Sequence, residues 1–291
     1  RLFATLRPEV VVVTGGYAGA AAGIAAGLMG VSLVLQEQNS YPGAVTKLLT
    51  RFARRVHVAY PEAIGRLPVG AGLCVVSGNP VRPKSSADRD EARRAFGVPE
   101  DATLTFVTGG SQGSLALNRG LTAYVEGVTR GELRRPALLH LLWATGRKHF
   151  DGVHAALAAA HAPAWVHVLP YVDDMPLALA AADFALSRAG AMTIAEFLNE
   201  GLPAILVPLP TSAEDHQSYN ARDLAAAGAA RHLPEAEMTP ARLARELDSM
   251  ASDPESLARM RRAARARARP DATREIARDV ATFLPPIRRA A

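Results

Sequence analysis

The pattern of hydrophobic and polar positions alternates between two kinds of segment. Short β-branched runs, such as residues 10–13, are followed by longer stretches with an apolar residue every three or four positions. This alternation predicts α/β architecture, with parallel strands joined by helices that cover both faces of each sheet. We expect strands near residues 9–14, 31–35, 55–59, 73–76, 103–108, 137–143, 164–169, 183–187 and 203–207, with helices between most of them and three more in the C-terminal third.

The pattern breaks at residues 78–84, which contain two prolines and are followed by the polar stretch 85–90. Pro-rich, aperiodic sequence is typical of a linker. A chain of 291 residues also fits two domains, at roughly 150 residues each. The part before the linker holds too few strands to complete a doubly wound sheet, whereas the part after it holds at least five. We therefore expect an incomplete N-terminal domain over residues 1–84.

A junction between strand and helix is predicted at residues 187–196, which read Ser-Arg-Ala-Gly-Ala-Met-Thr-Ile-Ala-Glu. The chain turns through Gly190, so the N–H groups near residues 191–193 and the positive end of the helix dipole can face a phosphate. Thr193 adds a hydroxyl. Glu196 lies about one turn further on, where its carboxylate suits sugar hydroxyls. Together these residues indicate a nucleotide site that recognises diphosphate and ribose separately.

Two further glycine turns follow predicted strands. Residues 109–114 read Gly-Gly-Ser-Gln-Gly-Ser and precede a helix expected over 115–130. They match neither the Walker loop nor the dinucleotide fingerprint, so a diphosphate loop and a simple tight turn both remain open. Gly15 and Gly16 precede an Ala-rich helix over 20–29. Two such loops on opposite sides of a cleft would suit an enzyme with two substrates.

Polar residues gather after the strand expected at 203–207. Asp215, His216, Gln217 and Asn220 stand where the C-terminal end of a parallel strand forms ligand sites. Gln217 and Asn220 are three apart on one helical face, and amides suit sugar hydroxyls, which both donate and accept. We expect Asp215 to cap the helix and Gln217 to contact ligand.

Composition narrows the function classes. The net charge is +5, and the single Cys74 excludes an internal disulfide. No apolar run approaches the roughly 18 residues of a transmembrane helix. A predicted basic helix suits an anionic membrane surface, with a solvated helix face as the alternative. Its members are Lys47, Arg51, Arg54 and Arg55, with the apolar Leu48, Leu49 and Phe52. The Arg-rich stretch 259–269 lacks aromatic residues, so we expect a solvated helix and no nucleic-acid partner.

Six segments in order, 37–39, 78–82, 109–113, 171–175, 187–196 and 215–220, closely resemble the MurG family. That family transfers GlcNAc from UDP-GlcNAc to lipid I, which gives lipid II in peptidoglycan synthesis. The resemblance implies a GT-B fold, in which two Rossmann-like parallel-sheet domains face a cleft. The acceptor domain would be residues 1–84, the UDP-GlcNAc domain 85–269, and a C-terminal helix within 270–291 would return to the first domain. It also implies a peripheral enzyme on the cytoplasmic face of the membrane.

The resemblance assigns roles to individual residues. Ser111 would contact the diphosphate region, Val172 the uracil through its backbone, and Ala191, Met192 and Thr193 the phosphates. Glu196 would hold the ribose, and Gln217 the GlcNAc hydroxyls with His216 beside it. Asn39 and Arg82 match the family's donor-contacting residues, and Gly15, Gly16 and Tyr17 match its acceptor loop.

The implied reaction is direct, inverting attack by the muramyl 4-hydroxyl of lipid I. It needs a base for that hydroxyl and stabilisation of departing UDP. The helix terminus at 190–193 and the Ser111 loop can stabilise UDP, so we expect neither metal nor cofactor, and we expect Asp173-Asp174 to cap the following helix. The base stays open between Glu37 and a family histidine upstream of Arg1. Gln36 stands where the family usually has another histidine.

Other function classes remain. A glycolipid synthase with a diacylglycerol acceptor would share the donor half, and a noncatalytic UDP-sugar-binding protein would bind without transfer. An NAD-dependent oxidoreductase is disfavoured, because no G-x-G-x-x-G opens a sheet with an acidic residue about 20 positions on.

Overall fold

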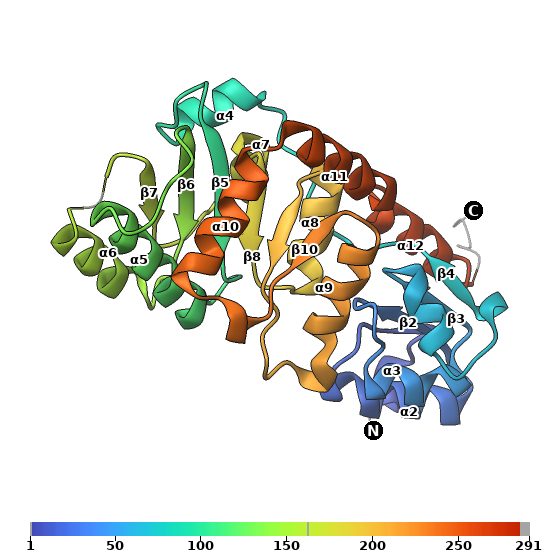
Figure 1. Cartoon of the computed structure of the whole chain (residues 1–291). Helices are drawn as coiled ribbons and strands as arrows, with labels where there is room; N and C mark the ends of the chain where they lie inside the picture. The colour runs from blue at the N-terminus through green and yellow to red at the C-terminus, as the bar shows by residue number, and fades with distance from the viewer. Residues whose placement is uncertain (1, 162, 286–291) are drawn as a thin grey trace. The chain divides into compact units, whose positions relative to one another are not determined.

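The computed structural model describes residues 2–161 and 163–285. The chain forms two compact units. The first runs to Val81 and takes in the segment from Arg269 onward, and the second is Arg82–Ala268. Each contains one parallel sheet with helices packed on it, which confirms the α/β prediction (Figure 1). In the described part of the chain, no helix is both long and apolar enough to cross a membrane.

The sheet of the first unit has four parallel strands in sequence order, β1-β2-β3-β4. Its core is formed by apolar side chains such as Leu33, Leu35 and Val56, which have almost no exposed surface. The strands are β1 (Val10–Val13), β2 (Ser32–Glu37), β3 (Arg55–Val58) and β4 (Cys74–Val76), and the helices are α1 (Leu2–Leu6), α2 (Tyr17–Met29), α3 (Ala44–Leu49) and α12 (Ala272–Ala281). Short 3₁₀ helices cover Thr50–Phe52, Pro61–Arg66 and Ala71–Leu73.

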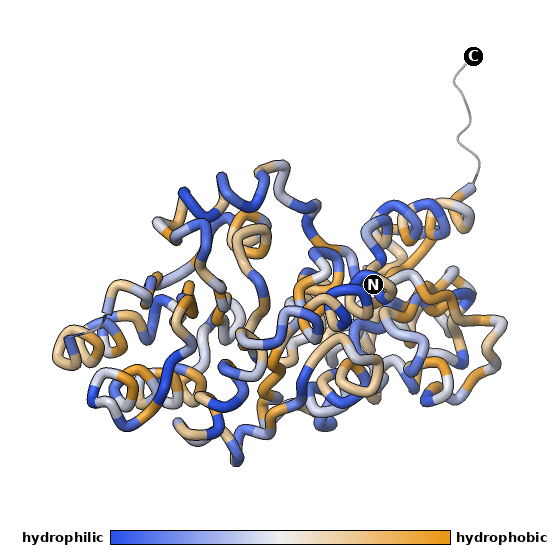
Figure 2. The backbone as a smooth tube through the Cα atoms, turned by 45° about the horizontal axis from the view of Figure 1, so that its top comes forward, coloured by the Kyte–Doolittle hydropathy of each residue, from blue (hydrophilic) through white to orange (hydrophobic). Residues whose placement is uncertain are grey.

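Helix α12 comes from the far end of the sequence but packs in the first unit. Hydrophilic and hydrophobic residues are interleaved along this helix, as Figure 2 shows. Asp279 of α12 lies 3.1 Å from Arg55 Nε and 3.0 Å from His57 Nε2, both on β3. Burial lowers the pKa of His57, and the Asp279 carboxylate opposes that shift. These contacts tie the end of the described chain to the first sheet.

The sheet of the second unit has six parallel strands in the order β10-β9-β8-β5-β6-β7. The first strand in sequence, β5, is central, and the chain adds strands on one side and then on the other. This is doubly wound topology, with its switch point between β5 and β8. The strands are β5 (Thr103–Thr108), β6 (Leu139–Ala144), β7 (Val166–Leu169), β8 (Phe184–Ser187), β9 (Ala204–Leu206) and β10 (Ala230–His232).

Helices flank this second sheet on both faces (Figure 1). They are α4 (Arg89–Ala95), α5 (Leu115–Thr129), α6 (Phe150–Ala159), α7 (Met175–Ala181), α8 (Ala191–Glu200), α9 (His216–Ala226), α10 (Pro240–Ala251) and α11 (Pro254–Arg267), with 3₁₀ turns at Ala213–Asp215 and Glu235–Glu237. Trp143, Phe106 and Leu121 are fully buried between the layers. Burial of this apolar surface stabilises the unit and holds the strand ends in place.

Three local predictions are wrong. Helix α4 begins inside the predicted linker 85–90, because Asp88 accepts a capping hydrogen bond from Glu91 N at 2.8 Å. The strand β10 was not predicted, since its Ala-Arg-His sequence is short and polar. The basic residues at 47–55 do not share one helix. Helix α3 ends at Leu49, a 3₁₀ turn follows, and Arg55 begins β3 because Arg54 N already pairs with Leu33 O at 2.8 Å.

Candidate nucleotide-sugar site

The junction after β8 has the predicted strand–turn–helix form. All four residues of β8 are buried, Gly190 occupies the N-cap position, and α8 starts at Ala191. Ile194, Phe197 and Leu198 anchor the helix against the core. The N–H groups of the first residues of α8 therefore point out of a fixed helix end, where the dipole favours an anion.

The loop after β5 is packed so closely that its glycines are required. Gly113 has a φ of 72°, and a Cβ there would lie 2.1 Å from Thr145 O. A Cβ at Gly109 would lie 2.3 Å from Ser114 N. Side chains at either position would displace backbone, because Cβ atoms do not approach other atoms this closely. The loop is thus a rigid backbone turn in which Ser111 is exposed.

Arg188 connects this loop to the junction after β8, and sequence reasoning gave it no role. Its side chain is buried, and its Nε donates to Ser114 Oγ at 3.0 Å. Its other nitrogens donate to Pro208 O at 3.0 Å and to the Glu235 carboxylate. The only signal in the sequence was an Arg placed directly after a buried strand, where a charge requires partners.

A cavity of about 220 Å³ opens where these loops meet. It is entirely within the second unit, at the C-terminal ends of β5 and β8, which is the switch point where doubly wound sheets bind ligands. Its wall includes six predicted site residues: Arg82, Ser111, Val172, Met192, Thr193 and Glu196. Residues separated by more than a hundred positions in sequence therefore surround one space.

Glu196 lies one turn into α8, on the wall of this cavity. Burial raises the pKa of its carboxyl group, and the nearby Arg82 guanidinium partly opposes the shift. A half-buried carboxylate with spare acceptor capacity suits two neighbouring hydroxyls, such as those of a ribose. Glu196 thus lies beyond the first turn of α8, on the same wall as Met192 and Thr193.

The loop after β7 supplies the opposite wall. The Val172 side chain is buried, and within the described residues its backbone N–H and C=O form no hydrogen bond. Buried or half-buried backbone groups need partners, which the polar edge of a base could supply. Asp174 accepts from Leu177 N at 3.0 Å and caps α7, as predicted for the Asp173-Asp174 pair. Asp173 instead lies 3.5 Å from Arg147.

His216 and Gln217 begin α9 and are not in the wall of the cavity. Gln217 Oε1 accepts from Ala189 N at 3.2 Å and from Leu209 N at 3.0 Å. Its amide oxygen thus braces two loops, and its NH₂ group is the part that can donate to a ligand. His216 Nδ1 lies 2.5 Å from Ala213 O.

Two expectations near α9 are wrong. Asn220 is fully buried and donates to Ala189 O at 3.2 Å, so it positions the loop and does not present its amide to sugar. Asp215 occupies the N-cap position but makes no capping bond, since its carboxylate accepts from Ser218 Oγ at 2.5 Å. Asp215 and Glu214 both have positive φ, 55° and 51°, a strained backbone that is frequent at functional sites.

The predicted residues of the first unit lie after β1 and β2. Glu37 is 4% exposed, and its carboxylate accepts from Asn39 N at 3.0 Å and from Gly43 N at 3.1 Å. It therefore shapes the loop that carries Asn39. Gly15 and Gly16 have φ values of 89° and 72°, and Tyr17 begins α2 with 83% of its side chain exposed.

Among the residues that the structure describes, no three His, Cys, Asp or Glu side chains gather where they could hold a metal ion. The cavity wall offers hydrogen bonding from backbone N–H groups, hydroxyls and Arg82, with Glu196 as an acceptor.

Comparison with known proteins gives a consistent family. Residues 104–276 match the Glycosyltransferase family 28 C-terminal domain, and residues 1–58 match its N-terminal domain. A UDP-N-acetylglucosamine--N-acetylmuramyl-(pentapeptide) pyrophosphoryl-undecaprenol N-acetylglucosamine transferase of Salinibacter ruber is 43% identical over 96% of this chain and 73% of its own length. The enzyme of the same name from Desulforudis audaxviator is 37% identical over 93% and 72%.

A solved structure supports the same conclusion. The crystal structure of Acinetobacter baumannii MurG superposes with a TM-score of 0.78 at 30% identity, covering 97% of this chain and 77% of that one. The match confirms the GT-B-type arrangement of parallel sheets that the resemblance implied. With the sequence matches above, it shows that this chain belongs to the MurG family of UDP-N-acetylglucosamine transferases.

Proposed function

We propose that the protein transfers GlcNAc from UDP-GlcNAc to the muramyl 4-hydroxyl of lipid I, with inversion, to form lipid II. The names of its relatives describe this donor and an undecaprenol-linked N-acetylmuramyl acceptor. The observation that carries the proposal is the cavity at the switch point of the second sheet, where the end of α8, the Ser111 loop and Glu196 share one wall.

The donor would bind with each part against a different element. The diphosphate would take N–H groups from Ala191, Met192 and Thr193 together with Ser111. Uracil would pair with the Val172 backbone, and the ribose hydroxyls would donate to Glu196. Arg82, on the same wall, would add positive charge near the leaving group.

Departure of UDP develops negative charge on the diphosphate. Donors that are already fixed in position stabilise that charge without reorganising, which lowers the barrier. The packed glycines at 109 and 113 and the Arg188 brace are what fix them. The Gln217 NH₂ group, with His216 beside it, would read the GlcNAc hydroxyls.

The acceptor would bind in the first unit, with Gly15, Gly16 and Tyr17 as its loop and Asn39 reaching the donor. Within this chain, Glu37 is the candidate for the base that takes the proton of the 4-hydroxyl. We also infer a peripheral site of action on the cytoplasmic face of the membrane, where Lys47 and Arg51 would meet anionic headgroups.

Calorimetric titration tests the donor assignments. Wild-type protein should prefer UDP-GlcNAc to UDP-glucose. Glu196→Gln should weaken UDP and UDP-GlcNAc alike by about tenfold, because both carry ribose. Gln217→Glu keeps an oxygen for Ala189 and Leu209 N–H but removes the NH₂ donor, so it should weaken UDP-GlcNAc more than UDP. Equal loss of both ligands in Gln217→Glu, or unchanged UDP affinity in Glu196→Gln, would contradict these roles.

Transfer assays separate the remaining function classes. Radiolabel from UDP-GlcNAc should pass to lipid I and not to diacylglycerol. Transfer to diacylglycerol alone would indicate the glycolipid synthase, and tight donor binding with no transfer to either acceptor would indicate a UDP-sugar-binding protein.

A further inference from the structure

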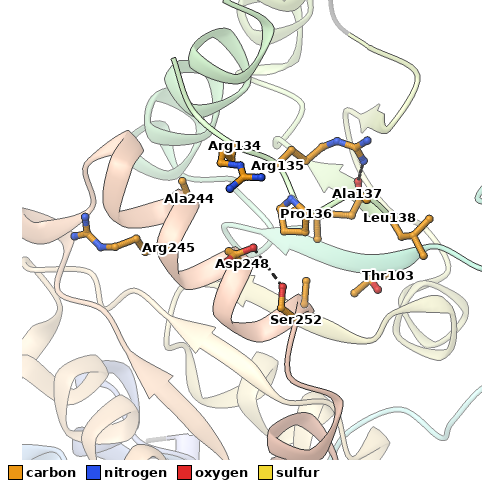
Figure 3. A pocket seen from close by; sticks show the side chains of 12 residues that line it. Thr103, Arg134, Arg135, Pro136, Ala137, Leu138, Ala244, Arg245, Asp248 and Ser252 are labelled. Atoms are coloured by element: carbon orange, nitrogen blue, oxygen red, sulfur yellow. Dashed lines mark hydrogen bonds between the residues drawn. The ribbon is translucent and has the colours of Figure 1, made fainter. Parts of the chain in front are cut away.

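A second and larger cavity, of about 620 Å³, lies at the opposite ends of the strands of the second sheet. It is lined by Thr103 and Leu139, which begin β5 and β6, whereas the nucleotide-sugar cavity lies beyond the last residues of those strands. The loop 134–138 forms one side and α10 the other (Figure 3). Its size falls within the range of small-molecule sites, roughly 300–1,000 Å³.

The charged residues of the lining are mainly cationic, with Arg134, Arg135 and Arg245 against one carboxylate, Asp248. Arg134 and Arg245 are exposed, and neither has an ion-pair or hydrogen-bond partner in the part of the chain that the structure describes. Figure 3 shows the Arg134 guanidinium over the pocket near Ala244, and Arg245 extending from the rim. Unpaired guanidinium groups around a hollow leave donors available to an anion.

Arg135 is held in place on the side of the pocket formed by the loop 134–138. It donates to Leu139 O at 2.6 Å, and its guanidinium carbon lies 5.1 Å from the ring centre of Trp165. Asp248 is occupied in part by Ser252 Oγ, which donates to it at 3.3 Å (Figure 3). The positive charges of the fixed Arg135 and the unpaired Arg134 therefore exceed the single negative charge of Asp248.

Tyr124 provides an independent observation beside this pocket. Its phenol is fully buried and packs edge-on to Trp165 at 6.3 Å between ring centres. Within the described chain its hydroxyl has no hydrogen-bond partner. Burial raises the pKa of Tyr124 to about 12, and Arg135 and Asp248 both act on it electrostatically. The Tyr124 hydroxyl is therefore buried without an acceptor among the described residues, and its ring contacts Trp165, the ring over which the Arg135 guanidinium lies.

We propose that this pocket binds a phosphate-bearing ligand, with Arg134 and Arg135 on the phosphate oxygens and Arg245 at the rim. Guanidinium forks match phosphate geometry and keep their charge at all physiological pH values. Pro136, Ala244 and Ala251 provide an apolar wall for the rest of the molecule. The phosphate comes either from a soluble phosphoester or from a phospholipid headgroup. This site is separate from the donor cavity, so the proposal does not depend on the transfer reaction.

Trp165 gives a direct optical signal, since a ligand on Arg135 changes the charge above its ring. The protein, saturated with UDP to fill the donor cavity, is titrated with inorganic pyrophosphate while fluorescence is recorded. Arg134→Ala should weaken binding by about tenfold or more, because it removes a charge-assisted hydrogen bond. Asp248→Asn should strengthen binding by about threefold, because it removes a repulsive charge. The matched control is Arg262→Ala, an exposed arginine on α11 whose loss changes net charge equally.

A second arm identifies the source of the phosphate. The same variants are sedimented with vesicles of phosphatidylcholine with and without phosphatidylglycerol. Weaker pyrophosphate binding by Arg134→Ala than by Arg262→Ala supports a soluble phosphoester as the ligand. If Arg134→Ala binds more weakly than Arg262→Ala only to phosphatidylglycerol vesicles, the ligand is a phospholipid headgroup. If Arg134→Ala and Arg262→Ala behave alike in both arms, or wild-type protein binds neither probe, the proposal is wrong.

Discussion

The glycine turn of the first unit and that of the second share one order of elements, strand then turn then helix, but differ in packing. Around Gly15 and Gly16 no atom lies within 4 Å of the position of a Cβ. Around Gly113 a Cβ would fall 2.1 Å from Thr145 O. The second turn is also braced through Ser114 by Arg188. The two turns thus differ at their last glycine: a Cβ at Gly113 would meet backbone, whereas a Cβ at Gly19 of the first turn would meet only the Val13 side chain, at 2.7 Å.

Replacing one glycine in each turn should give the largest difference in stability between the two units. Gly113→Ala should lower the free energy of unfolding of the second unit by roughly 3 kcal/mol or more, because the methyl group meets backbone and φ is positive. Gly15→Ala should cost the first unit only about 1 kcal/mol, from its positive φ alone. Both tryptophans, Trp143 and Trp165, lie in the second unit, so urea unfolding followed by their fluorescence reports that unit.

Comparing Gly113→Ala with Gly15→Ala shows which unit each substitution destabilises. Gly15→Ala should leave the tryptophan-monitored transition unchanged while it lowers the helical signal of the first unit. Similar tryptophan midpoints for Gly113→Ala and Gly15→Ala would show that the packing difference has no energetic consequence.

Removing the brace should give the next largest effect. Arg188→Leu leaves Ser114 and the buried side of Glu235 without their partner, which should cost about 3 kcal/mol. UDP affinity should fall as well, since the loop that carries Ser111 is released. Arg188→Lys keeps the charge but cannot reach several acceptors at once, so it should recover only part of both losses. Full recovery by lysine would show that charge matters here and geometry does not.

Local periodicity and spacing along one helix predicted the sheets, the strand–turn–helix at Gly190 and the wall residues Met192, Thr193 and Glu196. The resemblance to the MurG family added Arg82, Ser111 and Val172 to the predicted wall. The sequence could not predict that Arg188 spans from β8 to Ser114, since that contact joins residues 74 positions apart. It also could not separate the roles of Gln217 and Asn220, because an amide looks the same in sequence whether its partner is a sugar or Ala189 O. Strand β10 was missed because tertiary pairing with β9 decides its structure.

A smaller effect on the stability of the second unit should come from lowering the pH. Burial lowers the pKa of His140 on β6 and His167 on β7, whose ring nitrogens lie 3.2 Å apart. The unfolded chain therefore binds more protons than the native one below about pH 6.5, so stability is lost as pH falls through that value. Tryptophan-monitored unfolding should show this loss, and His140→Gln should reduce its slope. His154→Gln, at an exposed position of α6, is the control and should leave the slope unchanged.

The smallest effect on stability should come from Tyr17, at the open turn. Because 83% of its side chain is exposed, Tyr17→Ala should change the free energy of unfolding by no more than about 0.5 kcal/mol and leave UDP-GlcNAc affinity as in wild type. If the open turn receives the acceptor, the same variant should raise the KM for lipid I severalfold while the KM for UDP-GlcNAc stays constant. Tyr219→Ala, on α9 of the second unit, is the matched control. An unchanged KM for lipid I in Tyr17→Ala would remove this loop from the acceptor site and leave the contrast between the two turns purely structural.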